Sequence, residues 1–262
     1  MRTALSGADV VLHLAAISGV DDCESNPGQA YEVNVQGTNN VAWHCRETGT
    51  ALGFPFSMAV IGDPSTFPIT VDLPREPLNW YGRTKVLGER AIETFAQGAF
   101  PAHLFMISNL YGEHVIGETT VSKNTVINFF VNRALAGEPL TVYEPGSQAR
   151  NYVHVTDVAR ACIRSTEQLL EQRETGTTGV ERYEIASDEA PGVMQIAELV
   201  QTIAHDERDI DADIALVENP RGGETLVDTF TVDTSNTREQ LGWKPKTAVE
   251  DAIRSQFQKT ND

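Results

Sequence analysis

The fold of this chain is decided by a stretch near its start, S-G-A-D-V-V-L-H-L-A-A, which runs from Ser6 to Ala16. A continuous apolar run after a Gly-Ala-Asp turn predicts a strand buried on both faces, as in a parallel sheet. The strand is expected at 10–16. Its small C-terminal residues would let a flat ligand approach the backbone beside Leu14, Ala15 and Ala16, although an ordinary core strand is equally compatible with them.

Helical and apolar segments then alternate along the chain. Further strands are expected at 51–57, 103–107, 140–143 and 183–186, and helices at 27–48, 79–97, 122–136 and 193–205. Thr156 or Asp157 is expected to cap one more helix at its N-terminus. This alternation predicts an α/β fold, namely a doubly wound, Rossmann-type parallel sheet with ligands at the carboxyl ends of its strands.

Charge and composition exclude several classes of partner. The 262 residues include 37 Asp+Glu against 20 Lys+Arg, a net charge of -17, which disfavours nucleic acid and anionic membranes. An acidic surface with only five lysines suits a salt-rich, halophilic cytoplasm, although an ordinary acidic protein has the same composition. The three cysteines lack metal spacing and an even count, which indicates reduced thiols and no metal site. No apolar run reaches a membrane-spanning length and no signal-like N-terminus is present, so a cytoplasmic protein is expected.

The strongest chemical signal is W-Y-G-R-T-K, which runs from Trp80 to Lys85. Positions four apart share one face of a helix, so Tyr81 and Lys85 would project into the same cleft. A Tyr that acts as a base near neutral pH needs its pKa lowered by roughly three units, and a neighbouring ammonium would supply much of this. With Ser57 at the end of the preceding strand, they would form a proton-transfer group for a hydroxyl or a ketone, although Y-x-x-x-K alone also arises by chance.

Four other polar residues are candidates for binding. Asn34 either bonds a neighbouring backbone group or lies near the site. Asn109 falls at the strand edge that is expected to hold the catalytic group. Arg150 suits an anionic ligand or a structural ion pair. Arg221, which stands beside two glycines, could hold a phosphate with both arms of its guanidinium or could be a basic turn residue.

Eight short motifs stand in order along the chain. They are H-L-A-A at His13, N-V-x-G-T at Asn34, S-x-x-V-x-G at Ser57, Y-x-x-x-K at Tyr81, N-x-Y-G at Asn109, R-x-Y-x-H-V-x-D at Arg150, R-x-G-E at Arg221 and L-G-W-x-P at Leu241. In this order and spacing they resemble the NAD-dependent epimerase/dehydratase family of extended short-chain dehydrogenases, the group that includes UDP-glucose 4-epimerase.

The resemblance implies an enzyme that uses NAD, with NADP not excluded, on a nucleotide-diphosphate sugar. Tyr81 would be the acid/base for the sugar hydroxyl, Ser57 its hydrogen-bonding partner, and Lys85 would hold the nicotinamide ribose and lower the pKa of Tyr81. The favoured chemistry is reversible oxidation at a sugar hydroxyl that leads to 4-epimerisation. A reductase of a nucleotide-activated keto-sugar and a non-catalytic nucleotide-sugar-binding remnant are the alternatives.

The resemblance also assigns binding residues and an assembly. The cofactor would be bordered or bound by Leu14, Ala15, Ala16, Asn34, Tyr81 and Lys85, and the substrate diphosphate by Asn109, Arg150 and Arg221. The helices near 27–48 and 79–97 would form a homodimer. A dinucleotide-binding domain is expected at 1–112 and 155–186, and a smaller α+β substrate-binding domain at 113–154 and 187–262.

The chain departs from the family pattern at several positions. Members that dehydrate or decarboxylate carry an acid just after the active-site hydroxyl, where this chain has Met58 and Ala59. Ile61 and Met106 replace a common tyrosine and arginine. The sequence also contains no G-x-x-G-x-x-G turn of the kind that holds the cofactor pyrophosphate. We therefore expect an N-terminally truncated sheet with an open edge at its first strand, and weak or no binding of NAD.

Overall fold

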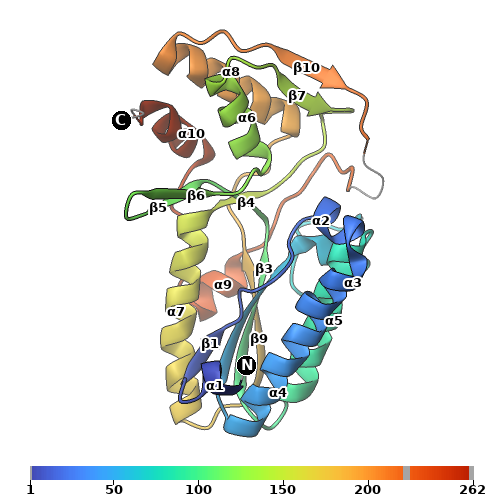
Figure 1. Cartoon of the computed structure of the whole chain (residues 1–262), viewed down its shortest axis with the longest axis vertical. Helices are drawn as coiled ribbons and strands as arrows, with labels where there is room; N and C mark the ends of the chain where they lie inside the picture. Colours follow the sequence, from blue (N-terminus) through green and yellow to red (C-terminus); the bar gives the residue numbers. More distant parts are fainter. Residues whose placement is uncertain (1, 221–224, 260–262) are drawn as a thin grey trace.

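The structure is a computed structural model, and it describes residues 2–220 and 225–259. Its lower part in Figure 1 is a parallel sheet in the order β1-β2-β3-β9. The strands are β1 (Val10–Leu12), β2 (Ala51–Ser57), β3 (Pro101–Ile107) and β9 (Gly179–Ile185). Helices cover both faces of this sheet, so the predicted α/β fold with a parallel sheet is confirmed.

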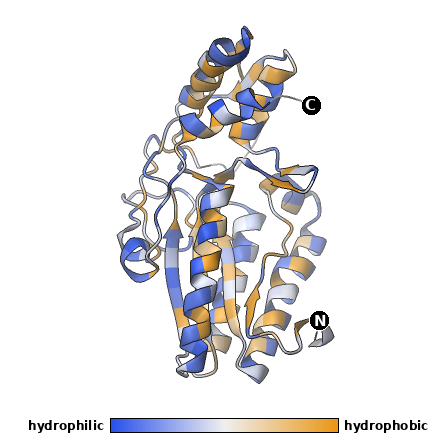
Figure 2. Ribbon diagram, turned by 90° about the vertical axis from the view of Figure 1, so that its left-hand side faces the viewer, coloured by the Kyte–Doolittle hydropathy of each residue, from blue (hydrophilic) through white to orange (hydrophobic). Residues whose placement is uncertain are grey.

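The helices divide between the two faces of the sheet (Figure 1). One face carries α3 (Pro27–Ala30), the π-helical turn η1 (Tyr31–Gln36), α4 (Gly37–Thr48) and α5 (Trp80–Ala96). The opposite face carries α7 (Val155–Glu174). These helices bear both hydrophilic and hydrophobic residues, as amphipathic helices that cover a sheet do (Figure 2).

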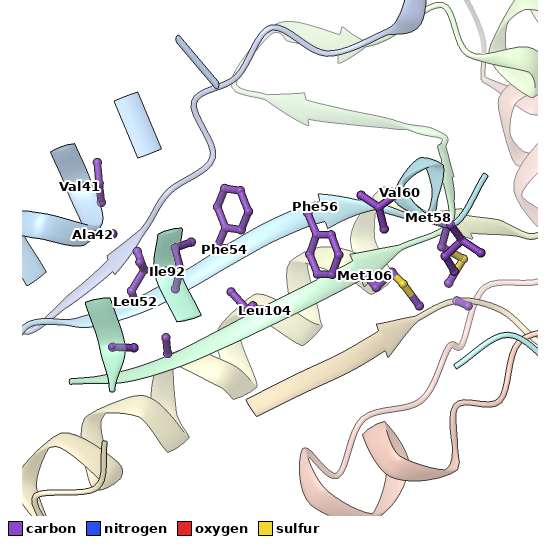
Figure 3. Packing of buried hydrophobic residues seen from close by; sticks show 14 of the residues in the cluster. Val41, Ala42, Leu52, Phe54, Phe56, Met58, Val60, Ile92, Leu104 and Met106 are labelled. Atoms are coloured by element: carbon purple, nitrogen blue, oxygen red, sulfur yellow. The ribbon is translucent and has the colours of Figure 1, made fainter. Parts of the chain in front are cut away.

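The core between α5 and the sheet is built from alternate residues of the central strands. Phe54 and Phe56 of β2 and Leu104 of β3 are almost fully buried, and Ile92 of α5 packs on the same side (Figure 3). His103, Phe105 and Tyr183, which contact one another on the other side of the strands, are also buried, so the sheet is covered on both faces. Because the strands are parallel and in register, their carboxyl ends lie together: Ser57 pairs with Ile107, and Ile107 with Ile185.

A second, smaller core lies above this sheet. It is formed by α6 (Val126–Leu135), α8 (Val193–Arg208) and α10 (Val249–Gln258) with the parallel pair β7 (Leu140–Tyr143) and β10 (Ile214–Val217). The pair β4 (Asn109–Tyr111) and β8 (Tyr152–His154) joins the two parts, beside the hairpin of β5 (Glu113–Ile116) and β6 (Thr119–Ser122). The remaining short helices are α1 (Arg2–Leu5), α2 (Val20–Ser25), η2 (Met58–Val60) and α9 (Ser235–Gln240).

The first strand is shorter than expected. The predicted parallel strand is confirmed at Val10–Leu12, whereas its extension to residue 16 is wrong, because pairing ends where His13 N donates to Gly53 O. The expected burial on both faces is also wrong, because only Val11 of the three strand residues is buried. The chain then leaves the sheet, and Leu14 is 62% exposed. A Cβ on Gly53 would lie 2.5 Å from Leu12 Cδ2, so the glycine provides the space in which this end of β1 packs.

The expected capping of α7 is also wrong. His154 is the N-cap, and its ring Nδ1 accepts a hydrogen bond from Thr156 N over 3.3 Å. Asp157 lies inside the first turn and is buried, where its Oδ2 accepts bonds from the backbone of Lys246 and Thr247, each over 3.0 Å. The carboxylate therefore fastens the C-terminal segment to α7.

The C-terminal segment packs against both parts of the molecule. Phe230 joins the core of the main sheet, and Trp243 packs with Phe105 and Tyr183 beside α7. The expected division, with all of 187–262 in a substrate-binding domain, stays a prediction. Within the described ranges, no helix has the length and apolar character needed to cross a bilayer, and no group of His, Cys, Asp and Glu is placed to hold a metal ion.

Candidate active site

Ser57 and Tyr81 are brought together at the carboxyl end of β2. Ser57 is the last residue of this strand and the N-cap of η2, where its Oγ accepts a bond from Ala59 N over 3.2 Å. Asn79 caps α5, and its Oδ1 accepts a bond from Gly82 N over 2.9 Å, which starts the helix so that Tyr81 lies in its first turn. The Tyr81 hydroxyl lies close enough to that of Ser57 for the serine hydroxyl to lower the pKa of the phenol.

Gly82 allows this approach. A Cβ at this position would lie 2.7 Å from Ala59 O and 2.8 Å from Pro77 Cβ. Both distances are below what a real Cβ contact shows, so any larger residue would push α5 away from η2. The glycine of W-Y-G-R-T-K therefore sets the distance between the helix that carries Tyr81 and the turn that follows Ser57.

The pKa of Tyr81 differs from the expectation. Burial of the phenol raises its pKa to about 12, and the hydrogen bond with Ser57 opposes this rise only in part. Lys85 was expected to lower the pKa of Tyr81, but its Nζ lies over the ring, 5.8 Å from the centroid, and the charge does not offset the desolvation of a phenolate. Without further positive charge beside it, Tyr81 is neutral at neutral pH.

Lys85 is a buried cation. Its side chain is held one helical turn after Tyr81, with 5% of the residue exposed and Nζ 5.3 Å from the centroid of the Phe54 ring. Burial lowers the pKa of Lys85 to about 8. Among the described residues, no hydrogen bond or ion pair engages this ammonium, so its three donors are available to a ligand.

Asn34 holds the loop after β1 against the catalytic helix. Its Oδ1 accepts a bond from Ile17 N over 2.8 Å, and its Nδ2 donates to Ile17 O over 2.9 Å and to Thr84 Oγ1 over 3.1 Å. The residue is 2% exposed, so of the two alternatives left open by the sequence, the structure shows the bonds to backbone. Through this clamp Ile17, which directly follows Ala15 and Ala16, is tied to Thr84 of α5.

His13 adds a neutral imidazole below the same loop. Its Nε2 lies 3.0 Å from Thr38 Oγ1, and its ring stacks on that of Phe54 at 5.8 Å between centroids. Burial, with a smaller contribution from the charge of Lys85, lowers the pKa of His13 to about 4. His13 therefore contributes no charge near neutral pH and supports the shape of the site.

The structure places two of the three residues that were expected to bind the diphosphate. Asn109 is exposed at the start of β4, where its Nδ2 donates to Asn151 O over 3.1 Å. Arg150 is half-buried, and its guanidinium donates to Thr225 O over 2.6 Å and to Ala149 O over 2.8 Å. Arg221 lies outside the described residues.

Two supporting residues escaped the sequence analysis. Thr84 is fully buried between Tyr81 and Lys85, accepting a bond from Asn34 and donating to Tyr81 O over 2.8 Å. Cys23, also fully buried, lies close enough to Lys85 for the two groups to influence each other's pKa. The only sequence signal for Thr84 was its position inside Y-x-x-x-K. Cys23 lies on α2, a helix that the sequence analysis did not predict.

A Rossmann-type sheet with Ser, Tyr and Lys at one strand edge places the chain in the class of extended short-chain dehydrogenases. The model of the NAD dependent epimerase/dehydratase family matches residues 1–185, and the chain belongs to this family. The resemblance found in the sequence is thereby confirmed.

Curated relatives match almost the whole chain. A UDP-glucose 4-epimerase of Corynebacterium glutamicum is 27% identical over 263 residues, which cover 94% of this chain and 75% of the relative. UDP-glucuronic acid decarboxylase 3 of Arabidopsis thaliana is 26% identical over 262 residues, covering 94% of this chain and 68% of the relative.

Solved structures show the same fold. The UDP-glucuronic acid 4-epimerase of Bacillus cereus, in complex with UDP-glucuronic acid and NAD, superposes with a TM-score of 0.82 at 19% identity, covering 98% of this chain and 76% of that chain. The UDP-glucose 4-epimerase of Bifidobacterium longum, in complex with NAD+ and UDP, also gives 0.82, at 21% identity and with 98% and 78% covered.

Proposed function

We propose that this chain is an enzyme that epimerises a nucleotide-diphosphate sugar at C4 by reversible oxidation of its hydroxyl, with NAD as cofactor. The observation that carries this proposal is the placement of Ser57 beside Tyr81, with Lys85 one turn along α5, at the carboxyl ends of a parallel sheet. Membership of the family supports it, and curated relatives are themselves named UDP-glucose 4-epimerases.

The described residues fit the nicotinamide end of the cofactor. The buried Lys85 ammonium could donate to the ribose hydroxyls, and the exposed, apolar Leu14 and Ala15 stand in the loop that Asn34 ties to the helix of Lys85. When bound, NAD would supply reversible hydride transfer at the sugar carbon, and its oxidised ring would bring a positive charge. Asn34 takes part by fixing Ile17 rather than through an exposed side chain.

Tyr81 moves the proton. Its phenolate accepts the proton of the sugar hydroxyl and returns it after the ketone has turned in the site. Ser57 donates a hydrogen bond to the same sugar oxygen and so holds it against Tyr81. Because burial raises the pKa of Tyr81 to about 12 with Lys85 already in place, ionisation of Tyr81 requires further positive charge, which the oxidised nicotinamide ring of bound NAD would add to that of Lys85.

The residues that follow Ser57 favour 4-epimerisation over related reactions. Dehydration and decarboxylation use an acid just after the active-site hydroxyl, and Met58 and Ala59, which occupy those positions, cannot transfer a proton. Asn109 and Arg150, joined by Arg221, are proposed to hold the diphosphate of the substrate. Arg150 donates to Thr225, the first described residue after Arg221.

The direct test is conversion of UDP-glucose to UDP-galactose, followed by NMR, with NAD added at a catalytic amount. Conversion without net formation of NADH is expected, and Tyr81→Phe is expected to abolish it. Failure to convert UDP-glucose, together with stoichiometric oxidation of NADH when a nucleotide-activated keto-sugar is supplied, would instead identify a reductase. UDP-sugar binding without turnover, in the presence of saturating NAD, would identify a non-catalytic binding protein.

We also propose a homodimer through α4 and α5. These helices pack side by side on one face of the sheet, and their outer surfaces expose Trp43 (47%) and Leu87 (45%), which a partner copy would cover. Sedimentation of wild type and Leu87→Glu tests this: the variant is expected to be monomeric. The acidic surface further supports work in a salt-rich cytoplasm, for which higher stability in molar salt is the test.

A further inference from the structure

Lys123 links the upper part of the molecule to the loop after β1. Its Nζ donates to Ser18 O over 2.5 Å and to Ser18 Oγ over 2.6 Å, across 105 positions of sequence. The backbone of Lys123 is itself held by the buried Asn128, whose Nδ2 donates to Lys123 O over 2.9 Å and to Gly112 O over 2.8 Å. Lys123 is therefore held at its backbone by Asn128 and at its ammonium group by Ser18.

The loop that Lys123 contacts belongs to the catalytic site. Ile17, the neighbour of Ser18, is clamped by Asn34, which also binds Thr84 next to Lys85. The positive charges of Lys85 and Lys123 both act to lower the pKa of the buried Cys23 thiol, although burial raises it overall. A single thiol thus lies within electrostatic range of both ammonium groups.

Lys123 faces a different part of the site from the diphosphate residues. Ser18 follows β1 at one edge of the sheet, whereas Arg150 N donates to Pro191 O, in the segment that follows β9 at the other edge. A substrate whose diphosphate lies at Arg150 and whose sugar lies at Tyr81 would therefore direct the far side of its sugar toward Ser18 and Lys123.

The ammonium has a donor to spare. Lys carries three N–H donors, and Ser18 accepts two of them. The side chain is exposed, and no carboxylate of the described residues forms an ion pair with it. In a chain of net charge -17, which repels anions over most of its surface, an anionic sugar needs such a local cation.

We propose that Lys123 is a specificity residue that binds the carboxylate of a uronic acid sugar, so that the substrate class is the nucleotide-diphosphate uronic acids. This inference rests on the proposed function of the same site. A neutral hexose offers the ammonium only the dipole of a hydroxyl group, whereas a carboxylate adds the attraction between two opposite full charges.

Calorimetric titration of the full chain with UDP-glucuronic acid, UDP-glucose and UDP tests the proposal. Wild type is expected to bind UDP-glucuronic acid roughly tenfold or more tightly than UDP-glucose, as one charge-assisted bond allows. Lys123→Gln is expected to remove this preference while affinity for UDP-glucose and UDP changes less than about twofold. Lys244→Gln, which removes the same charge from an exposed lysine on the α7 side, is expected to leave the preference intact.

Several outcomes would overturn the proposal. If Lys123→Gln lowered the affinity for all three ligands equally, the lysine would bind the diphosphate. If wild type bound UDP-glucuronic acid and UDP-glucose with equal affinity, the lysine would not recognise a carboxylate. Lys123→Arg controls for a loosened loop, because it keeps the charge and is expected to keep the preference. If none of the UDP ligands binds to wild type, the proposed function itself fails, and this inference fails with it.

Discussion

The Asn34 side chain donates to Thr84 Oγ1 over 3.1 Å and so joins the π-helical turn η1 to the helix that carries Tyr81 and Lys85. The same amide satisfies both backbone groups of Ile17. One buried side chain thereby fixes three segments around the catalytic edge, and the site depends on bonds that lie behind its reactive residues.

Replacing this amide should destabilise the protein. Asn34→Ala leaves Ile17 N, Ile17 O and Thr84 without their partner, and a buried group left unsatisfied costs about 1–3 kcal/mol. We expect a loss of that order in the free energy of unfolding, measured by urea denaturation. Asn40→Ala, an exposed position on α4, is the matched control and should change stability by less than about 0.5 kcal/mol. Equal effects of both variants would contradict the clamp.

The hydrogen bond between Ser57 and Tyr81 can be measured by titration. It lowers the pKa of Tyr81 against the effect of burial, which raises that pKa to about 12. Ser57→Ala should therefore raise the pKa of Tyr81 further. The pH-dependent ultraviolet absorbance of phenolate, taken as the difference between each protein and its Tyr81→Phe variant, isolates this group. An unchanged titration in Ser57→Ala would show that the two hydroxyls do not interact.

Lys85 should make stability depend on pH in the alkaline range. Its pKa is lowered from 10.5 to about 8 by burial, so between these values the unfolded chain binds more protons than the folded one and stability rises with pH. Below pH 8 the full penalty is present, about 3 kcal/mol. Lys85→Met should therefore unfold at higher urea than wild type at pH 7, with the difference shrinking toward pH 10. A constant difference across this range would argue against a buried ammonium.

Gly82 should tolerate no side chain. A Cβ at this position would meet Ala59 O at 2.7 Å, so Gly82→Ala must shift α5 away from η2 and separate Tyr81 from Ser57. We expect a destabilisation of about 1–3 kcal/mol, as for overpacking, together with the rise in the pKa of Tyr81 that is predicted for Ser57→Ala. Gly28→Ala, where a Cβ would meet nothing within 4 Å, provides the control and should be near neutral or stabilising.

Local patterns along the chain were sufficient for the class of fold and for the placement of the candidate site residues on β2 and α5. The apolar run at 51–57 is β2 as predicted, and Y-x-x-x-K places Tyr81 and Lys85 on one face of α5, because strand burial and helical spacing are properties of neighbouring residues. The residues of the eight motifs likewise identified the family without coordinates.

Only the tertiary structure decided the environment of Tyr81 and Lys85 and the contacts that hold the surrounding segments together. The pKa of Tyr81 rises rather than falls because burial, which is set by packing from distant segments, outweighs a charge one turn away. Asn34 meets Ile17, and Lys123 meets Ser18, across 17 and 105 positions of sequence. Such contacts depend on where the chain returns in space, and no periodicity or spacing along the sequence encodes the distance between atoms that come together only after folding.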